Sequence, residues 1–229
     1  FLAFWGFVPL LLTVEQRLNQ RGARSYLRLF LLLYPAFLLW NVLTCYWIAM
    51  TALGVGEDEQ VAAFVAGVLA VVVNALLMTL PVLAYAMVRK RLSVRNLTLK
   101  YLIFVPFWVG FEYLHFRWDL SWAWLTLGHA FSYYPFYLQY LEFTGVLGTS
   151  IHVLTAAAVL AAAVEAATTG RKFSFAGRMF LAAWLLLPLA LYPFLARPFG
   201  AVGQINVRVV QPNVDPYAKF AVLTPEAQM

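Results

Sequence analysis

Residues 61–88, VAAFVAGVLAVVVNALLMTLPVLAYAMV, contain no charged side chain. A helix needs about 20 apolar residues to cross a hydrocarbon core of about 30 Å, so this stretch is long enough to span a bilayer with some tilt. Three further charge-free stretches are long enough to span: residues 29–56, 143–164 and 179–196. A fifth, residues 97–115, is apolar except for Lys100, Glu112 and His115. The sequence therefore predicts an all-α polytopic membrane protein.

The overall composition agrees with this prediction. Of 229 residues, 63% are hydrophobic and 11% are charged, whereas a soluble domain carries about 25% charged residues. Residues 1–14 are apolar but too short for a full span, and the chain begins with Phe. We interpret them as the remainder of a helix whose beginning is missing or short. We therefore expect about six helical spans, the first one truncated.

Positive charge predicts the orientation of the spans. The numbers of Lys and Arg between the spans alternate: four in residues 15–28, none in 57–60, five in 89–100, one in 116–142 and three in 165–178. By the positive-inside rule, the basic segments face the cytoplasm, and residues 116–142 and the tail from Arg197 face outward. The net charge of +6 then reflects topology and contact with anionic lipid headgroups. We expect no nucleic-acid partner, because these charges lie in short loops between spans.

The fourth of these segments between spans is unusually aromatic. Residues 116–142 read FRWDLSWAWLTLGHAFSYYPFYLQYLE. Trp and Tyr concentrate at headgroup depth, so this segment is typical of an interfacial aromatic belt. A belt needs fewer aromatic residues, however, so a re-entrant or surface-lying element that handles lipid is an equal alternative.

The tail changes character after residue 199. Residues 205–210 alternate apolar and polar side chains and include β-branched residues, which predicts a strand. Residues 211–216 follow with two prolines and turn-forming residues. A single strand is not a domain. We therefore expect a transmembrane helical domain over residues 1–199, and over residues 200–229 a linker and the first strand of an α/β domain that continues elsewhere.

Several segments together resemble a known family, the bacterial apolipoprotein N-acyltransferases. The resemblance rests on Glu112, on WDLSWAWLTLG at residues 118–128, on Gln139, Gly145, Gly148 and Ser150, on LLWN at 38–41 with YWI at 46–48, on FVPLLL at 7–12, and on VRVVQPNVDPY at 207–217. It extends over nearly the whole chain in the correct order. The last of these segments is similar to the opening strand of that family's nitrilase-like domain.

The resemblance implies an architecture and an activity. The family has seven helices, a nitrilase-like α/β domain on the periplasmic side of the bacterial inner membrane, and a closing helix. It transfers an acyl chain from a phospholipid donor to the amino group of the N-terminal diacylglyceryl-cysteine of an apolipoprotein acceptor, without a cofactor. Its cysteine nucleophile forms a thioester and is assisted by a glutamate and a lysine, all in the nitrilase-like domain beyond Met229. This chain alone is then expected to hold no catalytic residue and to be inactive.

Five residues are candidates for positioning substrate or lipid: Glu112, Trp118, Trp122, Trp124 and Gln139. Glu112 lies ~18 Å of helical rise beyond Lys100, at 1.5 Å per residue, which places it in the outer half of the bilayer. A carboxylate there is costly and by default indicates function. The structural alternative is a partner such as Arg117 or a Trp N–H in the loop. Both interpretations stay open.

The remaining reactive side chains have simpler explanations. Cys45 is the only cysteine, and we expect it in mid-span, where an apolar environment makes a thiol inert. His115, His129 and His152 lack metal-ligand spacing, so we expect packing roles and no metal site. Residues 156–163 present small side chains suited to close helix packing.

Two other functions are alternatives to an acyltransferase. A multi-pass transporter of this size often shows two related halves, and no repeat relates residues 1–115 to 116–229. The other alternative is a non-catalytic membrane anchor of an outer soluble domain. A Trp-Pro-Glu-type motif followed by Lys and Cys further along the chain would favour the enzyme.

Overall fold

The computed structural model describes residues 2–18, 25–50, 57–119, 121–195 and 206–210. These residues form helices and connecting segments, and none of them is in a β-strand. The chain divides into two compact units, residues 1–45 with 70–196 and residues 46–69 with 197–229. The candidate site lies in the first unit.

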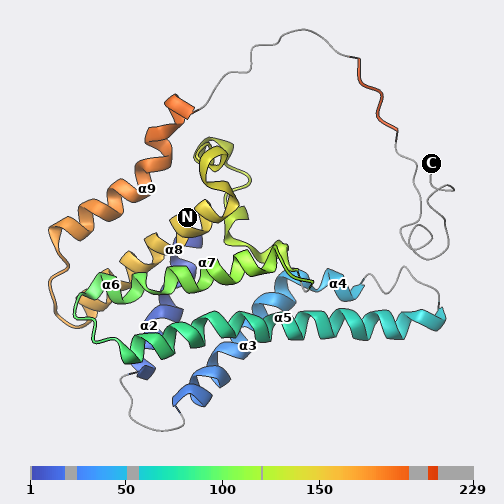
Figure 1. Ribbon diagram of the computed structural model, residues 1–229, viewed down its shortest axis with the longest axis horizontal. Helices are drawn as coiled ribbons and strands as arrows, with labels where there is room; N and C mark the ends of the chain where they lie inside the picture. Colours follow the sequence, from blue (N-terminus) through green and yellow to red (C-terminus); the bar gives the residue numbers. More distant parts are fainter. Residues whose placement is uncertain (1, 19–24, 51–56, 120, 196–205, 211–229) are drawn as a thin grey trace. The chain divides into compact units, whose positions relative to one another are not determined.

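The helices follow the apolar pattern of the sequence (Figure 1). In chain order they are α1 (Ala3–Gly6), α2 (Val8–Leu18), α3 (Ser25–Cys45), α4 (Trp47–Met50), α5 (Glu57–Arg91), α6 (Leu97–Leu102), α7 (Phe104–His115), α8 (Leu141–Thr168) and α9 (Phe175–Leu195). Three 3₁₀-helices, η2 (Ala123–Leu125), η3 (Leu127–His129) and η4 (Pro135–Tyr137), lie between α7 and α8.

Five segments of the described chain are long and apolar enough to cross a membrane: Ser25–Cys45, Gln60–Arg91, Leu97–His115, Leu141–Thr168 and Phe175–Leu195. The prediction of an all-α polytopic membrane protein is therefore confirmed. The apolar start of the chain forms α1 and α2, neither of which reaches the length of a span.

The predicted span over residues 29–56 ends earlier than expected. Helix α3 stops at Cys45, and α4 begins separately at Trp47; residues 51–56 lie outside the described part of the chain. The Thr44 hydroxyl donates a 2.7 Å hydrogen bond to the Trp40 carbonyl one turn earlier, a side-chain bond that competes with regular helix pairing. The mid-span position expected for Cys45 is thus wrong, since Cys45 is the last residue of α3, although its side chain is buried as expected.

The unit that contains residues 46–69 has a close helix contact of its own. A Cβ at Gly67 in α5 would lie 2.7 Å from the Ala49 Cα and 3.0 Å from the Ile48 carbonyl oxygen. Glycine therefore lets α5 approach the backbone of α4 within this unit.

Helix α8 is the centre of the first unit. It contacts α1, α2, α6, α7, α9 and η3, and α6 and α7 run beside it (Figure 1). The predicted small-residue stretch provides this closeness, because Ala156, Ala157, Ala158, Ala161 and Ala162 are all fully buried. Small side chains allow the backbones of neighbouring helices to approach closely in a membrane.

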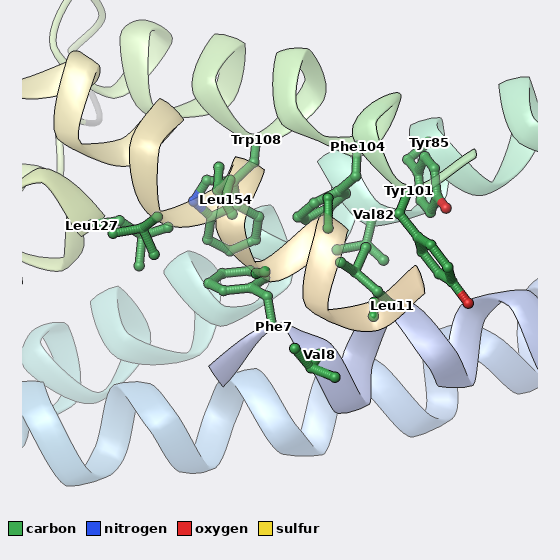
Figure 2. Packing of buried hydrophobic residues seen from close by; sticks show 14 of the residues in the cluster. Phe7, Val8, Leu11, Val82, Tyr85, Tyr101, Phe104, Trp108, Leu127 and Leu154 are labelled. Atoms are coloured by element: carbon green, nitrogen blue, oxygen red, sulfur yellow. The ribbon is translucent and has the colours of Figure 1, made fainter. Parts of the chain in front are cut away.

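Aromatic side chains fill the space between α2 and α7. Figure 2 shows Phe7, Phe104, Trp108 and Leu127 gathered in one apolar cluster. The Phe7 and Trp108 rings are perpendicular, with centroids 4.7 Å apart, a favoured geometry for aromatic pairs. This cluster holds the end of α7 on which the candidate site is built.

A buried ion network joins α2, α5, α6 and α8 near the C-terminal end of α8. Arg89 Nε of α5 lies 2.9 Å from Glu15 Oε1 of α2. Lys100 Nζ of α6 lies 3.6 Å from Glu15 Oε2 and also pairs with Glu165 of α8. Two carboxylates thus face two cations, and their formal charges cancel. A balanced cluster avoids the large penalty of an unpaired buried charge.

Two tyrosines complete this network. The Tyr85 hydroxyl donates to Glu15 Oε1 at 3.1 Å, and the Tyr101 hydroxyl donates to Glu165 Oε2. Both rings are fully buried. Its charged residues all lie in the three segments with several Lys and Arg residues, 15–28, 89–100 and 165–178. The network fixes α2, α5, α6 and α8 to one another.

The predicted strand over residues 205–210 stays a prediction, although the described residues 206–210 are not paired with another strand. Residues 206–210 are irregular and exposed, while residues 200–205 and 211–229, which complete the predicted linker and strand region, lie outside the described chain. A strand is defined by hydrogen bonds to a neighbouring strand, and the described residues place no such neighbour beside this segment.

Candidate functional site at the junction of α7 and the aromatic loop

Glu112 is the buried polar centre of the end of α7. Its side chain is 3% exposed, and its Oε1 accepts hydrogen bonds from Trp108 Nε1 at 3.0 Å and from the Leu127 backbone N–H at 2.9 Å. Trp108 lies one helical turn earlier on the same helix, whereas Leu127 belongs to the segment of residues 116–140, which we call the aromatic loop. The carboxyl group therefore ties this loop to the membrane-spanning helix.

These partners differ from those predicted. Arg117 is not the partner of Glu112: its guanidinium lies over the Tyr113 ring, 5.4 Å from the centroid. A Trp N–H does bond to Glu112, but it comes from α7 rather than from the loop. The partner from the loop is the main-chain N–H of Leu127. Residue types alone do not predict a main-chain partner.

The second carboxyl oxygen of Glu112 has a different environment. Within the described residues, Oε2 is buried and has no hydrogen-bond partner. The Ser150 hydroxyl of α8 interacts with the carboxyl group, although neither Ser150 Oγ nor Glu112 Oε2 makes a hydrogen bond of good geometry within the described chain. Helices α7 and α8 and the aromatic loop thus meet at this one carboxyl group.

Gly128, next to Leu127, explains how the loop reaches α8. A Cβ at Gly128 would overlap the backbone carbonyl of Val146. Gly145, immediately before Val146, has φ +64°, a conformation that glycine adopts without steric cost, and it kinks α8 there. Two glycines, one on each side of the contact, therefore let η3 pack directly on the backbone of α8.

The three candidate tryptophans occupy distinct positions on the loop. Trp122 is partly buried and Trp124 is 58% exposed; their rings are perpendicular, with centroids 5.3 Å apart. Trp118 Nε1 donates to His115 Nδ1 of α7 at 3.3 Å. Trp122 and Glu112 line the same small cavity. The structure therefore brings Glu112, Trp122 and Trp124 close to one another, with Trp118 linked through His115.

Gln139 does not join this group. Its Nε2 donates a 2.8 Å hydrogen bond to the Pro135 carbonyl at the start of η4. It supports the fold of the loop after η3.

A second link between the loop and the helices was missed by the sequence analysis. The Tyr137 hydroxyl donates to the Leu185 carbonyl of α9 and lies 2.9 Å from His152 Nε2 of α8. Burial raises the pKa of Tyr137 to about 12, so the phenol keeps its proton and remains a donor. A tyrosine followed by a histidine 15 residues later carries no motif that could have revealed this.

Trp184 of α9 also packs on His152. Its ring stacks on the imidazole with centroids 5.3 Å apart, and its Nε1 donates to the His152 backbone carbonyl.

The expected packing role of His152 agrees with these contacts. Within the described residues, no group of three or more His, Cys, Asp or Glu side chains is arranged to hold a metal ion.

An apolar cavity of about 640 Å³ opens beside the loop. It lies between α1, α2 and α3, and its lining includes Gly6, Phe7, Leu33, Trp40, Leu127 and Ala130. Leu127 thus contributes its side chain to this cavity and its backbone N–H to Glu112. A second apolar cavity of about 280 Å³ lies between α8 and α9, next to Tyr140 and Trp184.

These features define a polytopic helical membrane protein in which a buried carboxyl group holds an aromatic loop beside a large apolar cavity. The chain belongs to the family of the apolipoprotein N-acyltransferase N-terminal domain, whose model matches residues 1–159. It is 28% identical over 236 aligned residues to the apolipoprotein N-acyltransferase of Chlorobaculum tepidum. The alignment covers 98% of this chain and 39% of that protein, so the chain spans about two fifths of the length of this relative. No solved structure matches the chain.

Proposed function

We propose that this chain is the membrane-spanning part of an apolipoprotein N-acyltransferase. In this proposal the full-length protein transfers an acyl chain from a phospholipid to the N-terminal diacylglyceryl-cysteine of an apolipoprotein. The observation that carries the proposal is family membership over residues 1–159, together with the similarity to a named acyltransferase along nearly the whole chain.

The apolar cavity supports a lipid substrate. Its volume of about 640 Å³ falls within the ~300–1,000 Å³ that is usual for ligand sites, and its lining is almost entirely apolar side chains. Moving an acyl chain out of the bilayer costs about 0.8 kcal/mol per CH₂, so a cavity inside the membrane domain keeps this cost low. The aromatic loop forms one side of the cavity through Leu127 and Ala130.

The chemistry requires residues outside this chain. We place a cysteine nucleophile, a glutamate and a lysine beyond Met229, in a soluble nitrilase-like domain on the periplasmic side of the bacterial inner membrane. The thiolate attacks the phospholipid ester, forms a thioester and releases a lysophospholipid. The lipoprotein amine then attacks the thioester, which forms the amide and restores the thiol. A covalent intermediate lets two bulky lipids use the site in turn.

Residues 1–199 would then be the transmembrane domain, and residues 200–229 the linker and start of the soluble domain. Within the transmembrane domain, we assign Glu112, Trp118, Trp122 and Trp124 to the wall along which acyl chains reach the soluble domain. Gln139 keeps the loop folded through its bond to Pro135.

The test uses the full-length protein with a fluorescent phospholipid and a diacylated lipopeptide. We expect an N-acylated peptide and a hydroxylamine-sensitive acyl group on a cysteine beyond Met229, both detected by mass spectrometry. Cys45→Ser is the matched control and should retain full transfer, because this thiol is buried at the end of α3 and burial in apolar surroundings leaves a thiol inert. An acyl group on Cys45, or no transfer by the intact protein, contradicts the proposal. The second result favours a membrane anchor or a transporter.

A further inference from the structure

A small cavity lies against Glu112, separate from the two apolar cavities. Its volume is about 10 Å³, and it is lined by residues of α5, α7 and the aromatic loop, with Asn74, Glu112, Trp122 and Thr126 among them. A bound water molecule needs at least about 10–15 Å³ of such space, and it needs polar groups around it. The cavity therefore has room for a single water molecule.

Two polar atoms beside this cavity lack partners in the described part of the chain. Glu112 Oε2 is a hydrogen-bond acceptor in a side chain that is 3% exposed, and Trp122 Nε1 is a buried donor. Neither atom bonds to the other. Buried polar atoms in folded proteins are almost always paired, either with protein groups or with ordered water. One acceptor and one donor on the wall of the same small space are the groups that a water molecule can bridge.

We propose that one water molecule occupies this cavity, accepts a hydrogen bond from Trp122 Nε1–H and donates one to Glu112 Oε2. The Thr126 hydroxyl, on a buried residue in the same wall, offers a third polar group, and buried waters make about three hydrogen bonds on average. Ser150, whose hydroxyl interacts with the Glu112 carboxyl group, lies on α8 and is not among the residues that line this cavity.

The water gives Glu112 a second connection to the aromatic loop. The first is the direct bond from Glu112 Oε1 to the Leu127 N–H, and the second runs from Oε2 through the water to Trp122. Because the Trp122 and Trp124 rings pack at right angles with centroids 5.3 Å apart, a fixed Trp122 also restricts the exposed Trp124. Trp122 is thus a positioning residue. This inference goes beyond the proposed function and does not depend on it.

The test is a density map of the full-length protein, at a resolution at which other buried waters are visible. We expect a peak within hydrogen-bond distance of both Trp122 Nε1 and Glu112 Oε2. Replacing Trp122 by benzothienylalanine, in which sulfur takes the place of the N–H in a ring of nearly the same shape, should abolish that peak. The same replacement at Trp124 is the control and should leave the peak in place.

Three results would overturn the proposal. The cavity is empty in the unsubstituted protein, or Trp122 Nε1 bonds directly to a protein group, or the peak survives unchanged when only the Trp122 N–H is removed.

Discussion

The backbone N–H of Leu127 donates a 2.9 Å hydrogen bond to Oε1 of Glu112, 15 residues earlier in the chain. A carboxyl group inside a membrane domain is costly unless it has partners, and here its partners are the Trp108 indole N–H and the main chain of the aromatic loop. Glu112 therefore acts as the attachment point of the loop, and the side chains that follow Leu127 depend on it for their position.

The first prediction concerns this attachment. Glu112→Ala should speed hydrogen exchange of the Leu127 amide roughly 5- to 100-fold, because leaving a buried donor without its partner costs about 1–3 kcal/mol. Glu112→Gln, which retains an oxygen acceptor, should have a smaller effect. Hydrogen exchange read by mass spectrometry on loop peptides is the measurement. Glu142→Ala, at an exposed carboxylate, is the control, and equal effects of Glu112→Ala and Glu142→Ala would argue against the attachment.

The second prediction tests the contact between η3 and α8. Gly128→Ala should lower stability by about 1–3 kcal/mol, since its Cβ would overlap the Val146 backbone and overpacking has a cost of this size. Gly110→Ala, inside α7, is the matched control, because nothing lies within 4 Å of a Cβ there, and alanine favours a helix interior by roughly 0.5–1 kcal/mol over glycine. Thermal unfolding in detergent should therefore shift in opposite directions for the two variants. An unchanged midpoint for Gly128→Ala would show that the contact is loose.

The third prediction concerns the ion network. Lys100→Met leaves Glu15 and Glu165 without their shared cation, and breaking a buried pair in this way costs about 3–5 kcal/mol. Lys90→Met removes an exposed lysine that lies over the Tyr26 ring and should change the unfolding midpoint little. Adding Glu165→Gln to Lys100→Met should recover part of the loss, because Glu15 keeps its pair with Arg89. A Lys100→Met protein as stable as the Lys90→Met protein would refute this account of the network.

The fourth prediction tests the orientation. Tyr134, Arg91 and Lys172 are all exposed, so each can be replaced by cysteine and probed with an impermeant thiol reagent. The number of Lys and Arg residues alternates between successive segments that connect the spans. We therefore expect Tyr134→Cys to be labelled from outside the cytoplasmic membrane, and Arg91→Cys and Lys172→Cys only after the membrane is opened. Labelling of Arg91→Cys in intact cells would reverse the orientation.

The helical architecture could be predicted from the sequence because the bilayer imposes a simple requirement on length and apolarity. The predicted span over residues 97–115 coincides with Leu97–His115, and the predicted span over 61–88 lies within α5. The end of α3 at Cys45 could not be predicted in this way, because residues on both sides of the break are equally apolar.

The candidate site could be predicted only in part. Glu112 stands out as a carboxylate in an apolar segment, but its loop partner is a backbone amide, and main-chain groups carry no sequence signal. Likewise, the bond between Tyr137 and Leu185 spans 48 residues and ends on a carbonyl. The contact of Gly128 with Val146 depends on the kink at Gly145, which becomes visible only once φ is known.

The most direct test of the central claim compares two exposed tryptophans in the full-length protein. Trp124 is 58% exposed on the aromatic loop, and Trp5 is 50% exposed on α1, outside the loop. Acyl transfer to a diacylated lipopeptide is measured for Trp124→Ala and Trp5→Ala at matched expression. If the loop positions lipid, Trp124→Ala should fold normally but turn over at least about tenfold more slowly, because small misplacements of a substrate can cost up to ~100-fold in rate. Trp5→Ala should keep near-normal turnover. Equal and near-normal turnover by both variants would mean that the loop is only an interfacial belt, and would contradict the claim.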